Sequence, residues 1–457
     1  MKRMTKGLTM CALMGTVLVS PHISKAEVQS QYPLVYLAGI FDGKDFKDDK
    51  EKAKDWSEKQ FGAWENKLTH VQKEAISQFK VSPEKINTEL EKFSGKDSLT
   101  LQNGTEIKMD PQIKHLTEEL DKSLQDPTAK VSSTQYVYGK IPMSHFGYQS
   151  NFFYKPGIHE LDSKKINEWA STAKYGTWHG FTIANLTRSA LGSNDTFLVH
   201  MKVPKGSSMG ILGDNQVVLP RDSSFTVNDM KIVIENGKQV LKIEAELIPK
   251  EKIVEKMNDQ VNKLNNTLNS KLKLDKTSKL IKMDFSGLQS GYNMSKTEGA
   301  IKDFLSNVPS DLAKKCMEEL DGITFTDQKL MIENDAGSYT ASKNEIRIRP
   351  NHPGLINTDS PLNTASYVLL HEMGHVVGET VTNHSDISPQ FKSIFEKEKN
   401  NLTDLITYKG YAQKNASEFF AEVFKAMYSP DSKLRKAIQE QAPTAVAYIK
   451  EKIAQYK

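Results

Sequence analysis

Two periods of hydrophobic spacing follow one another along the chain, and the change between them falls near residue 133. From residue 45 to residue 130, apolar side chains recur every three to five positions among acids and lysines, which predicts amphipathic helices. After residue 133 they gather in short β-branched runs bounded by Gly, Pro or Asn-Asp, which predicts strands. These runs are 136–138, 196–201, 217–219, 231–234 and 240–245. Residues 27–248 are therefore expected to form an α+β domain with a largely antiparallel sheet.

A single apolar stripe follows, and it predicts one helix across residues 249–274. Its members are spaced three and four apart, at Val254, Met257, Val261, Leu264 and Leu268. We interpret it as a linker helix packed on a domain rather than as a coiled-coil partner. Residues 275–457 are expected to form a further, mainly helical domain with a small β-sheet. Its strands include residues 339–341 and 345–348, which flank Ser342–Asn344 as a hairpin.

Composition and charge limit the classes of function. With 457 residues, 26% charged and 38% hydrophobic, the chain is long enough for two or three packed domains. The formal net charge of +4 is small for this length, and no basic cluster is interleaved with aromatic residues. No nucleic-acid partner is expected.

The first 26 residues have the pattern of a secretory signal peptide. Lys2, Arg3 and Lys6 precede a short apolar segment, and Ser24–Ala26 offers small residues for cleavage. A retained membrane anchor is the alternative. No later segment reaches the length of a membrane-spanning helix, so we expect a secreted protein without stable membrane insertion. Only Cys11 and Cys316 occur, and loss of the signal would leave one thiol and no internal disulfide.

The segment Tyr367–His375 carries the chemistry. His371 and His375 lie four apart in the order H-E-x-x-H, so on a helix both imidazoles reach one metal, and Glu372 can deprotonate a water held there. Asn363-Thr364 supplies a start signal for this helix and Gly378 a stop signal. The simpler alternative is two surface histidines on an ordinary helix.

A catalytic zinc needs a third protein ligand, and two carboxylates are candidates. The class of zinc peptidases with a third histidine is disfavoured, because Val381 stands at that position and His384 comes three residues late. Glu418 and Glu422 share a helix face, so one could bind the metal while the other orients a ligating imidazole. Alternatively, Asn415 with Glu418 forms a helix-capping box.

Residues 40–248 resemble the ADP-ribosyltransferase domains of binary toxins. The segments that carry this resemblance are Asp45–Ala53, Val203–Ser207 and Val217–Ser223. In that family an arginine holds the dinucleotide phosphates, a Ser-Thr-Ser strand follows, and a Glu-x-Glu pair supports the transition state. The corresponding positions here are Gly139, Phe181–Ile183 and Asp214–Gln216. Neither glycine nor glutamine can supply the missing charge, so the resemblance implies a degenerate domain without transferase activity.

The same family uses silent copies of this domain to dock onto a pore-forming component. The resemblance therefore implies that residues 27–248 are a docking or substrate-recruiting module. An inert spacer is the alternative.

Residues 367–453 resemble the zinc metalloprotease family of lethal-factor-type domains and secreted Pro-Pro endopeptidases, and the fold-level similarity extends back to about residue 275. The segments that carry this resemblance are Phe391–Glu398, Asn401–Thr403, Asn415–Glu422 and Ala442-Pro443. It implies a zincin-type domain with Zn²⁺ held by His371, His375 and Glu418. It also implies Glu372 as the base, Glu422 beside the ligands and Tyr411 as a catalytic tyrosine, with Tyr408 as a rival. Ala412 stands where the family has glycine.

Together these features predict a secreted zinc endopeptidase, the enzymatic component of a bacterial toxin. Residues 339–348 are expected to pair with an extended peptide substrate. A translocation partner bound through residues 27–248 would deliver the chain into the host cytosol. Two alternatives stay open, namely a non-enzymatic binding protein with relic domains and a residual NAD-dependent transferase.

Overall fold

The computed structural model describes residues 43–100, 105–158, 160–188, 196–213, 215–235, 237–274, 279–328, 335–356, 364–407 and 410–455. Residues 42–457 cluster as one compact unit. The predicted signal peptide, residues 1–26, lies outside the described residues, as do Asp214 and Tyr408.

The first part of the unit forms α-helices, as the spacing predicted, and most of them begin at side-chain caps. They are α1 (Lys50–Lys67), α2 (His70–Val81), α3 (Pro83–Lys92) and α4 (Pro111–Gln125), with a small hairpin of β1 (Ser98–Thr100) and β2 (Glu106–Lys108). Asp49 and Asp110 accept backbone N–H groups at the starts of α1 and α4, and Thr69 forms a capping box with Gln72.

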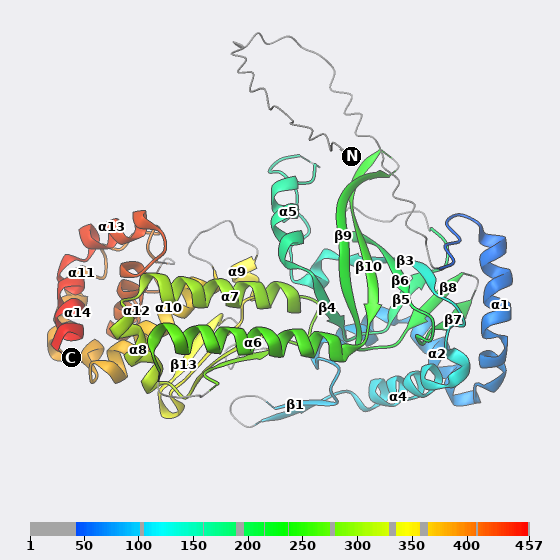
Figure 1. Ribbon diagram of the computed structural model, residues 1–457, viewed down its shortest axis with the longest axis horizontal. Coiled ribbons are helices and arrows are strands. Elements are labelled where there is room, and N and C mark those ends of the chain that lie inside the picture. The colour runs from blue at the N-terminus through cyan, green and yellow to red at the C-terminus, as the bar shows by residue number, and fades with distance from the viewer. Residues whose placement is uncertain are drawn as a thin grey trace, which may run out of the picture. The chain divides into compact units, whose positions relative to one another are not determined.

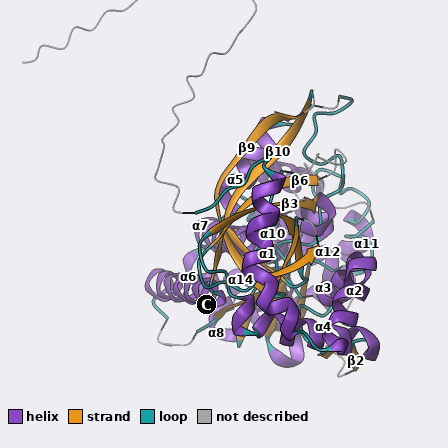
Figure 2. Ribbon diagram, turned by 90° about the vertical axis from the view of Figure 1, so that its right-hand side faces the viewer, coloured by secondary structure: helices purple, strands orange, loops and turns teal. Residues whose placement is uncertain are grey.

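An eight-stranded sheet follows, in the order β4-β9-β10-β6-β3-β5-β8-β7 (Figures 1 and 2). Its strands are β3 (Gln135–Pro142), β4 (Tyr175–Trp178), β5 (Thr182–Asn185), β6 (Thr196–Val203), β7 (Gly210–Gly213), β8 (Gln216–Leu219), β9 (Ser223–Glu235) and β10 (Lys238–Ile248), with helix α5 (Ser163–Thr172) between β3 and β4. Every pairing is antiparallel except β10 with β6. The α+β prediction is confirmed.

The remaining chain is mainly helical with a small sheet. The apolar stripe forms α6 (Lys250–Leu272), and the sheet has the order β11-β12-β14-β13. The elements are β11 (Ile281–Asp284), α7 (Ser290–Asn307), α8 (Ser310–Glu319), β12 (Gly322–Thr326), β13 (Gly337–Thr340), β14 (Glu345–Ile348), α9 (Pro353–Ile356), α10 (Ala365–His375), α11 (Pro389–Glu398), α12 (Ala416–Met427), α13 (Ser432–Gln441) and α14 (Pro443–Gln455).

Two separate hydrophobic cores stabilise these parts. One takes almost all its residues from Ala53 to Ala245, and the other runs from Leu264 to Ile449. Separate cores are the physical basis of separate domains. The exact division at residues 248 and 275 stays a prediction.

Two local predictions are wrong. Residues 339–348 were expected to act together as an edge, but β14 is an interior strand paired with both β12 and β13, so within this segment β13 alone lies at an edge of the sheet. Gly378 does not end α10 with a left-handed turn. The helix passes instead into a π-helical segment, Val376–Val381, that contains Gly378.

Candidate metal centre

Helix α10 presents His371 and His375 on one face, as the i, i+4 spacing requires. It begins where the Thr364 side chain accepts the Tyr367 N–H, which confirms Thr364 as the start signal. The two Nε2 atoms face each other at 3.2 Å. His371 is 7% exposed and packs in the protein interior, so the alternative of two surface histidines is wrong.

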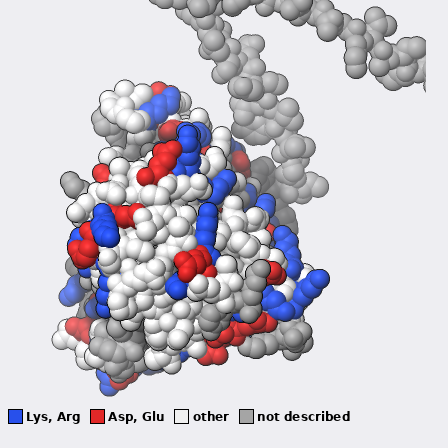
Figure 3. Space-filling view, turned by 90° about the vertical axis from the view of Figure 1, so that its left-hand side faces the viewer, with Lys and Arg blue, Asp and Glu red and all other residues white. Residues whose placement is uncertain are grey.

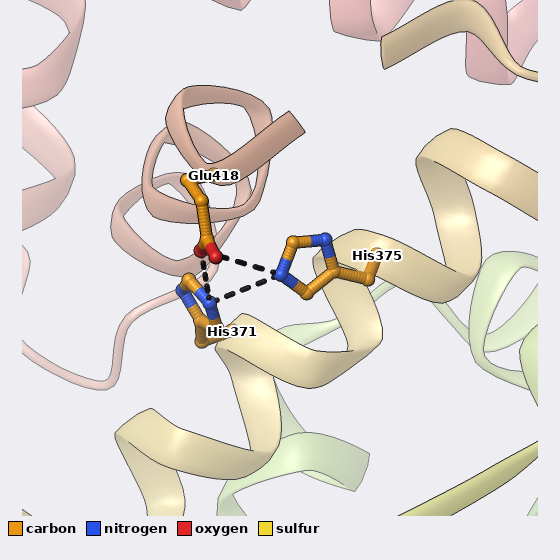
Figure 4. A group of neighbouring side chains, drawn as sticks. All are labelled: His371, His375 and Glu418. Atoms are coloured by element: carbon orange, nitrogen blue, oxygen red, sulfur yellow. Dashed lines mark hydrogen bonds and ion pairs between the residues drawn. The ribbon is translucent and has the colours of Figure 1, made fainter. Parts of the chain in front are cut away.

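Glu418 reaches the same point from helix α12. Its Oε2 lies 3.1 Å from His371 Nε2 and 3.5 Å from His375 Nε2, and Figure 4 shows the three side chains converging from two helices. Asn415 does cap α12, since its side chain accepts the Glu418 N–H. The Glu418 carboxylate nevertheless turns towards the histidines, so the capping box does not account for it.

The three donor atoms have the spacing of a tetrahedral metal site. Bonds of about 2.05 Å at tetrahedral angles put neighbouring ligand atoms about 3.3 Å apart. The three distances here are 3.2, 3.1 and 3.5 Å. Glu418 Oε2 is buried, and its contact with His371 does not have hydrogen-bond geometry, so within the described residues it lacks a hydrogen-bond partner. The donor set therefore fits a bound cation.

Glu422, one turn after Glu418, orients His371. Its Oε1 lies 2.8 Å from His371 Nδ1, which leaves Nε2 for the centre of the cluster. Lys425 donates to both Glu422 oxygens, at 2.8 and 2.7 Å, and all three side chains are buried. Although burial opposes it, the charge of Lys425 and the contact with His371 lower the pKa of Glu422 to about 2. Sequence reasoning missed Lys425. The signal was a lysine in the apolar stretch Val423–Met427.

The surroundings of the histidines are negatively charged. Although burial opposes it, Glu418 and Glu422 raise the pKa of His371 to about 9. The two carboxylates therefore favour positive charge at that point. A divalent cation would satisfy the same field in place of the proton.

Glu372 lies beside the cluster in a cavity of about 280 Å³. The cavity is also lined by Asp335, Gly337, His371, Tyr411 and Lys425. Glu372 is only 6% exposed, and burial raises the pKa of its carboxyl group. An effective general base has a pKa near the working pH, and the raised pKa moves the Glu372 carboxyl group towards that value.

Tyr411 lines the same cavity, with its ring centroid 5.5 Å from that of His371. Burial and the nearby Glu418 and Glu372 charges raise the pKa of Tyr411, so its phenol keeps its proton and can donate a hydrogen bond. Gly410, directly before Tyr411, has a φ of +79°, a conformation that glycine adopts without strain. Ala412, directly after Tyr411, is buried. His384 is exposed and takes no part in the cluster.

The three positions implied for the transferase site lie on neighbouring strands. Gly139 of β3 pairs with Ala184 of β5, and Asn185 of β5 pairs with Gln216 of β8. Phe181 is fully buried, and its backbone N–H and C=O are both bound by Asn87 of α3. The fold therefore places these positions on neighbouring strands, with no ionisable side chain at Gly139, Phe181 or Gln216.

Comparisons with known proteins divide the chain in the same way. Residues 267–452 match the family described as anthrax toxin lethal factor, N- and C-terminal domain. Residues 53–251 match the family described as ADP-ribosyltransferase exoenzyme. This is a toxin-like protein with two such domains. Both resemblances inferred from the motifs are confirmed.

Individual proteins similar to this chain were also found. Lethal factor of Bacillus anthracis is 27% identical over 325 residues, which cover 65% of this chain and 39% of that protein. The chain therefore spans well under half the length of the curated relative it matches. Among solved structures, the ADP-ribosyltransferase toxin Plx2a of Paenibacillus larvae is 25% identical, with a TM-score of 0.38, and covers 45% of this chain and 99% of its own. C3larvin from the same organism is 25% identical, with a TM-score of 0.35, and covers 42% and 94%.

Within the described residues, no helix is long and apolar enough to cross a membrane. On the face shown in Figure 3, basic and acidic side chains are intermixed rather than gathered by sign. That face offers no basic surface of the kind that nucleic-acid binding uses.

Proposed function

We propose that the chain is a secreted zinc-dependent endopeptidase and the enzymatic component of a bacterial toxin. One observation carries the proposal. His371, His375 and Glu418 place three donor atoms 3.1–3.5 Å apart, beside a buried glutamate and a tyrosine in one cavity. Two imidazoles and one carboxylate are a ligand set of catalytic zinc, in which a fourth position stays open for water or substrate.

Each residue of the site would have a separate role in peptide hydrolysis. Bound zinc would polarise the scissile carbonyl and acidify the attacking water. Glu372 accepts the proton of that water and passes it to the leaving amine. The Tyr411 hydroxyl, protonated at neutral pH, donates to the oxygen on which negative charge develops. Glu422, held ionised by Lys425, keeps His371 in the tautomer whose Nε2 would bind the metal.

An extended peptide would bind along β13. This strand is an edge of its sheet, and its first residue, Gly337, lines the cavity that contains Glu372. Backbone hydrogen bonds from an edge strand hold any peptide sequence in register and leave selectivity to side-chain pockets. The substrate class is therefore a protein segment that is extended at the cleavage site.

We further propose that residues 27–248 act as a docking module for a pore-forming component that delivers the chain into host cells. The support is the family match over residues 53–251, combined with uncharged side chains where a transferase needs charge. Pull-down of a pore-forming component by this segment would support the assignment. A pore-forming partner that binds only residues 275–457 would refute it.

The deciding experiment is a cleavage profile on a peptide library, with and without a chelator. The wild-type chain is expected to cut, chelation to stop it, and added zinc to restore it. Glu372→Ala is expected to abolish cleavage while one zinc stays bound per chain. Glu379→Ala, a glutamate in the following π-helical segment, is the matched control and is expected to cut normally.

Two other outcomes would select the alternatives. Stoichiometric zinc without cleavage of any peptide or candidate protein would favour a binding protein. Transfer of label from a dinucleotide onto lysate proteins would favour a transferase, for which the family match over residues 53–251 is the supporting observation. Loss of that transfer in Gln216→Ala would locate it in the first domain.

A further inference from the structure

The two histidines of the cluster are oriented by different devices. His371 contacts the Glu422 carboxylate directly, whereas His375 contacts a hydroxyl. His375 Nδ1 lies 3.3 Å from Ser417 Oγ, and the Ser417 hydroxyl donates to Asp386 Oδ2 at 2.5 Å. Ser417 directly precedes Glu418 on α12, so one turn of that helix supplies both a donor atom of the cluster and a contact to His375.

The direction of these hydrogen bonds follows from the chemistry of the three groups. An ionised carboxylate can only accept, so the single Ser417 proton goes to Asp386. The Ser417 lone pairs are then free to accept from His375 Nδ1–H. A neutral imidazole with its proton on Nδ1 has an unprotonated Nε2. That atom is the one that faces His371 Nε2 and Glu418 Oε2.

A tight backbone turn and a close approach to Gly378 place Asp386. After the π-helical segment, Asn383 and His384 both adopt left-handed backbone angles, with φ of 51° and 58°, and they turn the chain into the short helix Ser385–Ile387. A Cβ atom on Gly378 would stand 2.7 Å from Asp386 Cβ, so glycine is needed for this approach. Tyr448 of α14 fixes the turn by donating to the Ser385 carbonyl at 3.1 Å.

Asp386 is also buried more deeply than a solvated acid would be. It is 3% exposed, and its second oxygen, Oδ1, has no hydrogen-bond partner within the described residues. Burying a carboxylate with one unsatisfied oxygen costs free energy, so its presence in a native structure calls for a functional explanation. The Ser417–His375 contact supplies such an explanation.

We propose that Ser417 and Asp386 are positioning residues of the metal centre, which hold His375 in the tautomer and ring orientation that binding of a divalent cation requires. The inference rests on the proposed zinc site and names two residues that the sequence motifs did not indicate. It accounts together for Gly378, for the left-handed turn and for the buried Asp386. The proposal is tested by measuring the affinity of the chain for zinc, which does not depend on whether the chain cleaves peptides.

The test measures the zinc dissociation constant of the full chain by competition with a chromophoric chelator. Loss of an outer hydrogen-bond partner typically weakens metal binding about 10- to 100-fold, and Ser417→Ala is expected to do so. Ser417→Thr, which keeps the hydroxyl, is expected to recover most of the affinity. The visible spectrum of the cobalt-substituted protein should change in Ser417→Ala and return towards wild type in Ser417→Thr.

Ser429→Ala is the matched control. Ser429 is a buried serine of the same domain whose hydroxyl pairs with Tyr367 at 2.9 Å, and neither residue is a proposed ligand. It should lower stability to urea about as much as Ser417→Ala and leave the zinc dissociation constant unchanged. Equal weakening of zinc binding by both variants would mean a general loss of packing and would overturn the proposal.

A double-mutant cycle tests whether the two residues act in series. Asp386→Asn keeps the size of the side chain but removes its charge, and it is expected to raise the dissociation constant about threefold, since charge-assisted bonds are roughly twice as strong as neutral ones. In the Ser417→Ala background it should have no further effect. An undiminished effect there, or a Ser417→Ala dissociation constant within twofold of wild type, overturns the proposal.

The outcomes separate this proposal from the proposed function. Wild-type protein that binds zinc tightly but cuts nothing overturns the endopeptidase and leaves the positioning roles to be judged by affinity. Normal cleavage and normal zinc affinity in Ser417→Ala overturn the positioning roles and leave the endopeptidase intact. A wild-type chain that binds no zinc overturns both.

Discussion

Gly337 and Glu372 lie so close together that β13 and α10 leave no room for a side chain between them. A Cβ atom on Gly337 would stand 2.7 Å from Glu372 Oε1 and 2.3 Å from Val368 Cγ1. The start of β13 is thereby pressed against the proposed general base. An extended substrate along β13 would consequently pass directly beside Glu372.

Substituting Gly337 should therefore impair cleavage without removing the metal. In Gly337→Ala the methyl group must displace either β13 or Glu372, and misplacement of a reacting group by about 1 Å can cost about 100-fold in rate. We expect kcat/KM to fall 10- to 100-fold on that principle, with zinc content unchanged. Gly299→Ala in α7, where a Cβ meets nothing within 4 Å, is the control and should retain full activity. Equal activity of the two variants would contradict the close approach.

Removing the Lys425 charge should destabilise the second domain. In Lys425→Met the buried Glu422 loses its cation, and breaking a buried ion pair from one side costs about 3–5 kcal/mol. Urea unfolding should show this loss, while Lys436→Met, at a side chain that is 80% exposed, should change stability by less than about 0.5 kcal/mol.

The double variant Lys425→Met/Glu422→Met distinguishes unpaired charge from lost packing. With no charge left to bury, much of the stability should return, although His371 then lacks its partner and zinc binding should stay weak. A double variant no more stable than Lys425→Met alone would show that packing, not charge, is the cause.

Acid should destabilise the first domain through Glu244. Burial opposes the shift, but His200 at 2.6 Å and Lys242 at 2.6 Å lower the pKa of Glu244 from 4.5 to about 2. A folded-state pKa below the unfolded one contributes stability that is present above pH 4.5 and is lost as the pH falls towards 2. In Glu244→Gln the free energy of unfolding should therefore fall less steeply across that range. Glu58→Gln, at a side chain 66% exposed, should behave as wild type in acid denaturation followed by fluorescence.

The single thiol of the described residues should report unfolding of the second domain. Cys316 is fully buried, and burial raises its pKa to about 12, so the reactive thiolate is scarce in the folded protein. Modification by a thiol reagent should be negligible under native conditions and should follow the urea unfolding curve of the second domain. Rapid labelling of the folded protein would contradict this burial.

Local spacing was enough to predict much of this protein. The switch from helical to strand periodicity located the α+β domain, because side-chain direction depends only on neighbouring residues. The facing pair His371 and His375 and the capping Thr364 could also be predicted from local spacing, because all three lie on or next to one helix. Glu418 could be proposed as a ligand from family motifs, but its own surroundings in the sequence equally fitted a helix cap.

Packing between distant segments decided the rest. Only the crossing of α10 and α12 turns the Glu418 carboxylate towards the histidines while Asn415 caps the helix. Only the folded chain brings Lys425 to Glu422 in a buried pair, Asp386 to Ser417 across 31 residues, and Gly337 against Glu372. Periodicity cannot reveal such contacts, because whether a polar side chain is solvated or buried against a partner depends on which helices and strands surround it. For that reason Gly378 looked like the end of a helix in the sequence and is instead the place where another turn of the chain packs against it.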